Sequence, residues 1–189
     1  MPCLSRETGE TRVHVCVETG KGELRGATGI PFFDHMLETF SRYSGLSIEV
    51  SVQELKRVDD HHVVEDVAIV LGRALDKMLG DRKGIRRFGY ALIPMDDALA
   101  YAAVDLARRP YFVSRGLQWS RDSIGGLALE NVEHFLRSLA FEARFTLHVG
   151  IVYGSNDHHK VEALFKAVGI ALREAMKPGE SISTKDTLL

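Results

Sequence analysis

The six residues Asp60-His61-His62-Val63-Val64-Glu65 return 97 positions later as Asp157-His158-His159-Lys160-Val161-Glu162. A pair upstream of them is repeated as well, because Asp34-His35 returns as Glu133-His134 after 99 positions. A period of this length is too long for a solenoid unit, so it indicates the duplication of one half-domain. We therefore expect a first half-domain at residues 1–86 and a second at residues 87–189.

Hydrophobic periodicity around the repeat predicts the same elements in both halves. Residues 11–18 and 46–52 alternate between apolar and polar side chains, as half-buried strands do. A short helix is expected from Pro31 to Gly45, and a longer one from His61 to Gly80 with Asp60 as its N-cap. In the second half we expect strands at residues 88–93, 99–106, 111–118 and 145–151, and helices at 131–143 and 158–176. This order predicts an α+β fold of two duplicated half-domains, each a mostly antiparallel four-stranded sheet with two helices on one face.

Composition excludes several classes of protein. The 189 residues include 24 basic and 26 acidic ones, which gives no global charge that favours nucleic acid or a membrane surface. No apolar run is long enough for a membrane span or a signal peptide, so we expect a cytoplasmic protein. Cys3 and Cys16 are too few for a disulfide framework and lack a zinc-type spacing. Nitrogen and oxygen atoms should therefore hold any metal.

Histidine is the commonest metal ligand in proteins, and six of the eight histidines fall in the repeat. At about 100° per residue, His61, His62 and Glu65 share a helix face nearly opposite the apolar stripe. Because both copies show this pattern, metal binding is a better explanation than two unrelated helix starts. Two ions could each take three imidazoles and one carboxylate, and manganese, iron, zinc and nickel all suit such donors. The candidate ligands are His35, His61, His62, Glu65, His134, His158, His159 and Glu162.

Ligand faces that point away from their own sheets need a partner. We therefore expect groups from another element or another subunit to complete each coordination shell, which places the metal sites at an interface. Asp34, Asp66 and Glu133 are candidate acceptors that would orient the ligating rings. For each of them, a role as a solvated helix cap is an equal alternative.

Distinctive motifs occur across nearly the whole chain. They are Arg6-Glu7-Thr8-Gly9-Glu10-Thr11, Gly29-Ile30-Pro31-Phe32-Phe33-Asp34-His35-Met36-Leu37, Asp60-His61-His62 with Glu65-Asp66, Arg82-Lys83-Gly84-Ile85-Arg86-Arg87-Phe88-Gly89, Asp105-Leu106 with Arg109-Pro110, Val132-Glu133-His134-Phe135, Asn156 with His158-His159 and Glu162, and Ser183-Thr184-Lys185. Taken together, these motifs resemble the imidazoleglycerol-phosphate dehydratase family of histidine biosynthesis. The resemblance implies a ribosomal protein S5 domain 2-like fold, two Mn²⁺ ions per active site, and a 24-subunit shell with active sites between subunits.

The family reaction dehydrates D-erythro-imidazoleglycerol phosphate to imidazole acetol phosphate. The chemistry implied is a metal-bound imidazolate that expels the hydroxyl while a carboxylate takes a carbon-bound proton. By motif match Glu10 is that carboxylate, although the residues alone leave Glu7 as a competitor. The family also implies that the small-molecule phosphate substrate is held by Glu10, Arg87, Arg109, Ser183, Thr184 and Lys185.

Two departures from the family pattern and two alternative functions stay open at this stage. Asp186 stands where a small glycine is usual, and residues 53–58 replace a glycine-acid loop. A dinuclear phosphate-ester hydrolase would share the metals and the basic residues. A metal-storage protein would need only the histidine clusters, so the basic set with Ser183–Lys185 argues against it.

Overall fold

The computed structural model describes residues 1–180 and contains two copies of one arrangement. The first copy begins with the strands β1 (Cys3–Glu7), β2 (Thr11–Thr19) and β3 (Leu24–Ala27). The helix α1 (Pro31–Ser44), the strand β4 (Leu46–Glu54) and the helix α2 (His61–Leu79) complete it. The second copy consists of β5 (Phe88–Met95), β6 (Ala98–Asp105), β7 (Tyr111–Arg115), α3 (Glu130–Glu142), β10 (Thr146–Tyr153) and α4 (Asp157–Met176). A small hairpin, β8 (Ser123–Ile124) and β9 (Leu127–Ala128), precedes α3.

Both sheets have the same topology. The strand orders are β1-β2-β4-β3 and β5-β6-β10-β7, with two antiparallel pairings and one parallel pairing in each. Each parallel pairing joins the strand before the short helix to the strand after it, as a crossover requires. The predicted α+β fold with duplicated, mostly antiparallel sheets is thus confirmed.

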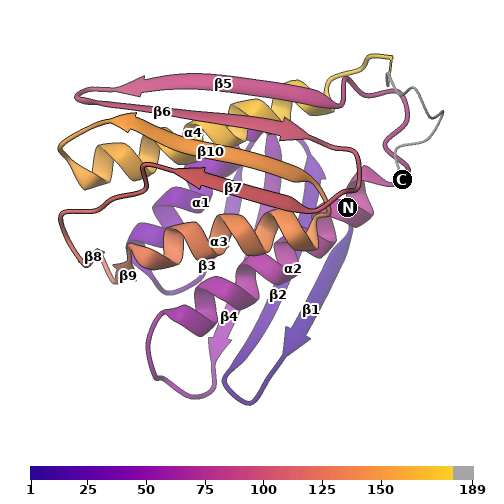
Figure 1. Ribbon diagram of the computed structural model, residues 1–189. Coiled ribbons are helices and arrows are strands. Elements are labelled where there is room, and N and C mark those ends of the chain that lie inside the picture. The colour runs from indigo at the N-terminus through magenta and orange to yellow at the C-terminus, as the bar shows by residue number, and fades with distance from the viewer. Residues whose placement is uncertain (181–189) are drawn as a thin grey trace.

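The helices lie between the two sheets and connect the halves (Figure 1). Helix α2 packs on β2 of its own sheet and also on α3, while α4 packs on β5 and β6 and also on α1. One continuous hydrophobic core results, and it includes Phe40 and Leu75 from the first half and Phe135 and Leu172 from the second. Because each long helix contacts the short helix of the other half, residues from both copies meet along these two seams.

A glycine allows one of these helices to approach its sheet closely. A Cβ atom on Gly89 of β5 would lie 1.9 Å from the carbonyl oxygen of Ala171 on α4. No side chain fits into that space, so the close contact between β5 and α4 depends on glycine. Among the helices of residues 1–180, none combines the length and apolarity that crossing a membrane requires.

Several local predictions were wrong or incomplete. A four-stranded first sheet was expected, but its strands β1 and β3 were not located in the sequence, and β7 ends at Arg115 rather than at residue 118. Asp60 is the N-cap residue of α2, as predicted, but its side chain makes no capping hydrogen bond, and the Asp59 carboxylate accepts from the N–H of His61 instead. Cys3 and Cys16 form a disulfide between β1 and β2, which their sequence spacing did not predict.

Candidate metal centre

A first ligand cluster lies on the seam between α2 and α3. His61 and Glu65 are one turn apart on α2, and His134 approaches them from α3. The Nε2 atom of His134 lies 3.2 Å from an Oε1 atom of Glu65, and the rings of His61 and His134 stack with centroids 4.6 Å apart. Two imidazoles and one carboxylate therefore converge from both halves of one chain.

The pseudo-equivalent cluster lies on the other seam, between α4 and α1. His158 and Glu162 are one turn apart on α4, and His35 comes from α1. An Oε2 atom of Glu162 lies 3.1 Å from Nε2 of His158 and 3.4 Å from Nε2 of His35. Burial tends to raise the pKa of Glu162, but the ammonium of Lys166 and the neighbouring rings of His35 and His158 outweigh it and lower that pKa. The carboxylate is thus held in the form that binds cations.

The two clusters differ in what orients their first histidine. Asn131 of α3 is buried, and its Nδ2 atom donates to Asp60 at 2.9 Å. Its Oδ1 atom lies 3.0 Å from Nδ1 of His61. Since an amide oxygen only accepts, Nδ1 of His61 must carry the proton, which leaves a lone pair on Nε2 that could bind a cation. In the second cluster the ring of Phe32 packs at 5.0 Å on the ring of His158.

His62 lies outside the first cluster and contacts a carboxylate from the β1–β2 turn. Its Nδ1 atom is 3.0 Å from an Oε2 atom of Glu10. The backbone oxygen of Glu10 accepts hydrogen bonds from the N–H groups of Leu55 and Lys56, at 2.7 and 3.1 Å. The loop that departs from the family pattern therefore fixes the position of Glu10.

The competing carboxylate, Glu7, has a different partner. Both of its oxygens accept from Arg12, at 2.8 and 2.9 Å. These hydrogen bonds and the charge of Arg12 lower the pKa of Glu7. The structure thus places Glu10, and not Glu7, beside a predicted metal ligand.

The second half repeats this arrangement with aspartate. His159 lies outside the second cluster, and its Nδ1 atom is 2.6 Å from an Oδ1 atom of Asp97 in the β5–β6 turn. Hydrogen bonds from His159, from the Ser155 hydroxyl and from backbone N–H groups hold the pKa of Asp97 well below its ordinary value. Sequence reasoning missed Asp97, although its place between two strands matches the place of Glu10. An alignment of the two halves would have revealed it.

None of the three predicted ring-orienting acceptors makes a hydrogen bond to a cluster histidine in the described part of the chain. Asp34 accepts from the N–H and hydroxyl of Thr28 at 2.6 and 2.7 Å, Asp66 accepts from Arg6 at 2.6 Å, and Glu133 accepts from Ser114. These carboxylates fix loops and strands to helices. Asn131 orients His61 in their place.

The predicted phosphate-binding arginines lie at the opposite end of the molecule. The N–H of Arg87 donates to the carbonyl of Ala175 near the end of α4, whereas His158 is near its start. At about 1.5 Å per residue, about 25 Å of helix separates the two ends. Arg87 also makes a two-point ion pair with Asp105, at 2.7 and 3.0 Å, and Arg109 lies 3.4 Å from the same carboxylate. Ser183, Thr184, Lys185 and Asp186 fall outside the described residues.

Duplicated α+β halves, with an imidazole-carboxylate cluster of the kind that could hold a metal ion on each seam between them, define the class of this protein. Comparisons with known proteins narrow this class. Residues 28–172 match the family model described as imidazoleglycerol-phosphate dehydratase, and the chain belongs to that family. Its members are hydro-lyases of histidine biosynthesis.

Individual relatives cover almost the whole chain. The imidazoleglycerol-phosphate dehydratase of Pyrobaculum arsenaticum is 54% identical over 185 residues, which are 97% of this chain and 98% of the relative. That of Methanopyrus kandleri is 48% identical over 190 residues, covering 98% and 94% of the two chains. The crystal structure of the Staphylococcus aureus enzyme superposes with a TM-score of 0.82 at 34% identity, covering 94% of this chain and 99% of that one. The Pyrococcus furiosus enzyme gives 0.83 at 35% identity, with coverages of 98% and 100%.

Proposed function

We propose that this protein dehydrates D-erythro-imidazoleglycerol phosphate to imidazole acetol phosphate, with two Mn²⁺ ions in each active site. The observation that carries the proposal is the pair of matching clusters, each with an additional histidine that contacts a turn carboxylate. The relatives' shared name supplies the substrate. A cytoplasmic location remains a prediction.

The residues of both clusters fit a divalent ion. A cation at about 2.1 Å from each donor atom holds neighbouring ligand atoms about 3.0–3.4 Å apart. The nitrogen-oxygen pairs of the two clusters lie 3.1–3.4 Å apart. His61, Glu65 and His134 would hold one ion, and His35, His158 and Glu162 the other. When bound, the ions would lower the pKa of the substrate's imidazole ring, so that the imidazolate form is available to expel the hydroxyl.

Glu10 is the residue that we propose as the base. It stands at the tip of the β1–β2 turn, is partly exposed and lies beside His62. Its carboxylate would take the carbon-bound proton of the substrate, and the enol left by loss of hydroxide would then become the ketone. Two hydrogen bonds to its backbone oxygen fix the main chain at Glu10, and the contact with His62 directs its carboxylate toward the predicted metal ligands.

The distance between the histidine clusters and the predicted phosphate-binding arginines within one chain supports an active site shared between subunits. The helix length that separates Arg87 from His158 is far greater than an imidazole ring joined to a three-carbon phosphate. Arg87 and Arg109 of one subunit would therefore meet the clusters of another, with Ser183–Lys185 completing the phosphate site. His62 and His159 lie outside the clusters of their own chain and would contribute to ions held mainly by neighbouring subunits. The proposed 24-subunit shell is an assembly that would provide these contacts.

Product analysis tests the proposed function against both alternatives. Metal-free protein reloaded with Mn²⁺ and given imidazoleglycerol phosphate should form a ketone product while inorganic phosphate stays at background. Release of inorganic phosphate would favour the phosphate-ester hydrolase. Tight metal binding with neither product would favour storage.

A further inference from the structure

A third group of ligand-type side chains lies on strands β1 and β2, on the face of the first sheet that points away from the helices. Cys3 and Cys16 are directly opposite each other in the register of the two strands, and Ser5 and His14 are the next such pair along this face. The neighbouring residues Val13 and Val15 of β2 point into the core. The group is therefore separated from the helix clusters by the sheet itself.

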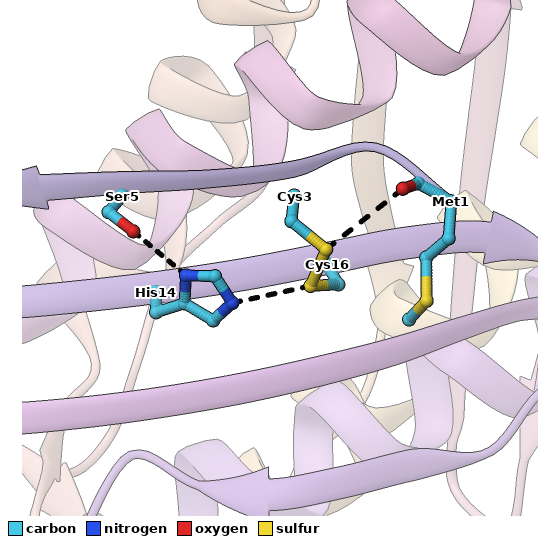
Figure 2. Close-up of a disulfide and its surroundings, with 5 residues drawn as sticks. All are labelled: Met1, Cys3, Ser5, His14 and Cys16. Carbon is cyan, nitrogen blue, oxygen red and sulfur yellow. Dashed lines mark hydrogen bonds between the residues drawn. A yellow bond between two sulfur atoms is a disulfide. The ribbon is translucent and has the colours of Figure 1, made fainter.

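The ring of His14 is aimed at the sulfur atoms (Figure 2). Its Nε2 atom lies 3.3 Å from Sγ of Cys16, and its Nδ1 atom lies 2.8 Å from the hydroxyl oxygen of Ser5. When Nδ1 donates its proton to this hydroxyl, Nε2 presents a lone pair toward the sulfurs. This is the arrangement in which an outer hydrogen bond orients a ligating histidine.

The spacing of these atoms fits a zinc-type ion once the disulfide is reduced. With Zn–S bonds of about 2.3 Å and a Zn–N bond of about 2.1 Å, a tetrahedral site holds sulfur and nitrogen about 3.6 Å apart. The present separation of 3.3 Å between Cys16 and His14 is close to that value. The three candidate ligand atoms all lie within 4.8 Å of one another. Glu49, the partner of Cys16 on β4, adds an exposed carboxylate to the same sheet.

We propose that the reduced form of this group binds one Zn²⁺ ion through Cys3, Cys16 and His14, with water in the fourth position. Two thiolates and an imidazole are ligands that zinc prefers over manganese. The site is thus distinct in chemistry from the helix clusters, which contain only nitrogen and oxygen donors. The disulfide is its closed form, in which the sulfurs are not available to the ion.

Reduction of the Cys3–Cys16 disulfide, which makes the site available to zinc, requires a dithiol as reductant. The dithiol transfers two electrons and two protons to the disulfide, becomes a cyclic disulfide, and leaves two thiols on the protein. Zinc binding then releases both thiol protons to solvent. Oxidation of the dithiolate by a disulfide reverses the sequence and expels the ion.

Co²⁺ substitution provides a specific test, because thiolate-to-cobalt charge-transfer absorption in the near ultraviolet reports only on sulfur ligands. Co²⁺ bound to the helix clusters does not contribute to this band. Protein reduced with a phosphine should develop the band with one equivalent of Co²⁺ per chain beyond those bound by the helix clusters, and Zn²⁺ should displace it. Protein with the disulfide intact should show no such band.

Variants test the ligand set. Replacing both Cys3 and Cys16 with serine should abolish the band, and His14→Ala should weaken Co²⁺ binding about tenfold or more. The matched control is His148→Ala, since His148 is the other histidine outside the repeat and lies exposed on the second sheet. Absence of the band in the reduced natural chain would overturn the proposal. Equal Co²⁺ affinity of the His14 and His148 variants would do so too.

Discussion

Replacing Asn131 with alanine should weaken one metal cluster and leave the other unchanged. Asn131 is 2% exposed, donates to Asp60 at 2.9 Å and lies 3.0 Å from Nδ1 of His61. The alanine variant removes the acceptor that fixes the tautomer and orientation of His61. At the corresponding place in the second half, Phe32 contacts His158 through its ring, so that cluster has no amide to lose.

The expected loss can be estimated from the role of Asn131. Removal of a group that orients a metal-bound histidine typically lowers metal affinity about 10- to 100-fold. This corresponds to about 1.4–2.7 kcal/mol at the His61–Glu65–His134 cluster. Asp60 keeps its hydrogen bond from the N–H of Ala128 at 2.7 Å, so the loop before α2 should stay in place.

Graded chelation of Mn²⁺-loaded protein, followed by metal analysis, would measure this effect. The natural chain provides the reference, and the His35–His158–Glu162 cluster provides an internal control in the same molecule. In the alanine variant, one of the two ions should be removed at a roughly 10- to 100-fold lower concentration of free chelator, while the other is removed at the same concentration as in the natural chain. Parallel loss of both ions, or unchanged affinity for both, would refute the assigned role of Asn131.

Three further perturbations give distinct outcomes. Arg82→Met should lower the free energy of unfolding, measured in urea, by about 3–5 kcal/mol. The reason is the loss of a fully buried guanidinium that pairs with Asp76 and donates to three backbone carbonyls. A change below about 1 kcal/mol would contradict this expectation. Glu10→Gln should reduce kcat about 10²- to 10⁴-fold with metal affinity retained, whereas Glu7→Gln should stay within a few-fold; an active Glu10 variant would remove this residue from the mechanism. Removal of the ions with a chelator should abolish dehydration and dissociate the assembly, as followed by light scattering, and an assembly that stays intact without metal would argue against ions shared between subunits.

The duplication itself could be predicted from sequence because both halves share hydrophobic periodicity and closely similar short motifs. Residues 11–18 and 46–52 alternate cleanly, and both long helices carry a histidine pair in their first turn. Strand β3 escaped prediction because it is only four residues long and contains Gly26, whose positive φ is uncommon in a strand. Its parallel pairing with β4 depends on a crossover that no local pattern encodes.

For the predicted ligands, too, local geometry could be predicted from sequence, whereas contacts between distant elements could not. Helical periodicity predicted that His61 and Glu65 share a face, and this local geometry is found. It could not predict that His134 from the other half completes the cluster, because α2 and α3 meet through a long-range packing seam. Asn131 looked like a residue at the start of a helix, and only its buried contacts show that it orients His61.

The two cysteines illustrate the same limit. Cys3 and Cys16 are separated by 13 positions, a spacing that matches no common metal motif. Strand register places them opposite each other, with His14 alongside. Register is set by the whole β1-β2-β4-β3 sheet, so the cluster becomes visible only in the fold.

The central claim is that each active site combines the cluster end of one subunit with the Arg87 end of another. Mixing of subunits tests this claim most directly. Glu10→Gln lacks the proposed base beside His62, and Arg87→Ala lacks a proposed phosphate anchor at the far end. Each variant alone should have strongly reduced activity. Assemblies formed by co-expression of the two should regain a sizeable fraction of dehydratase activity, because some sites would combine an intact Glu10 with an intact Arg87 from a neighbouring subunit. Mixed assemblies that remain as inactive as the separate variants would contradict the shared site.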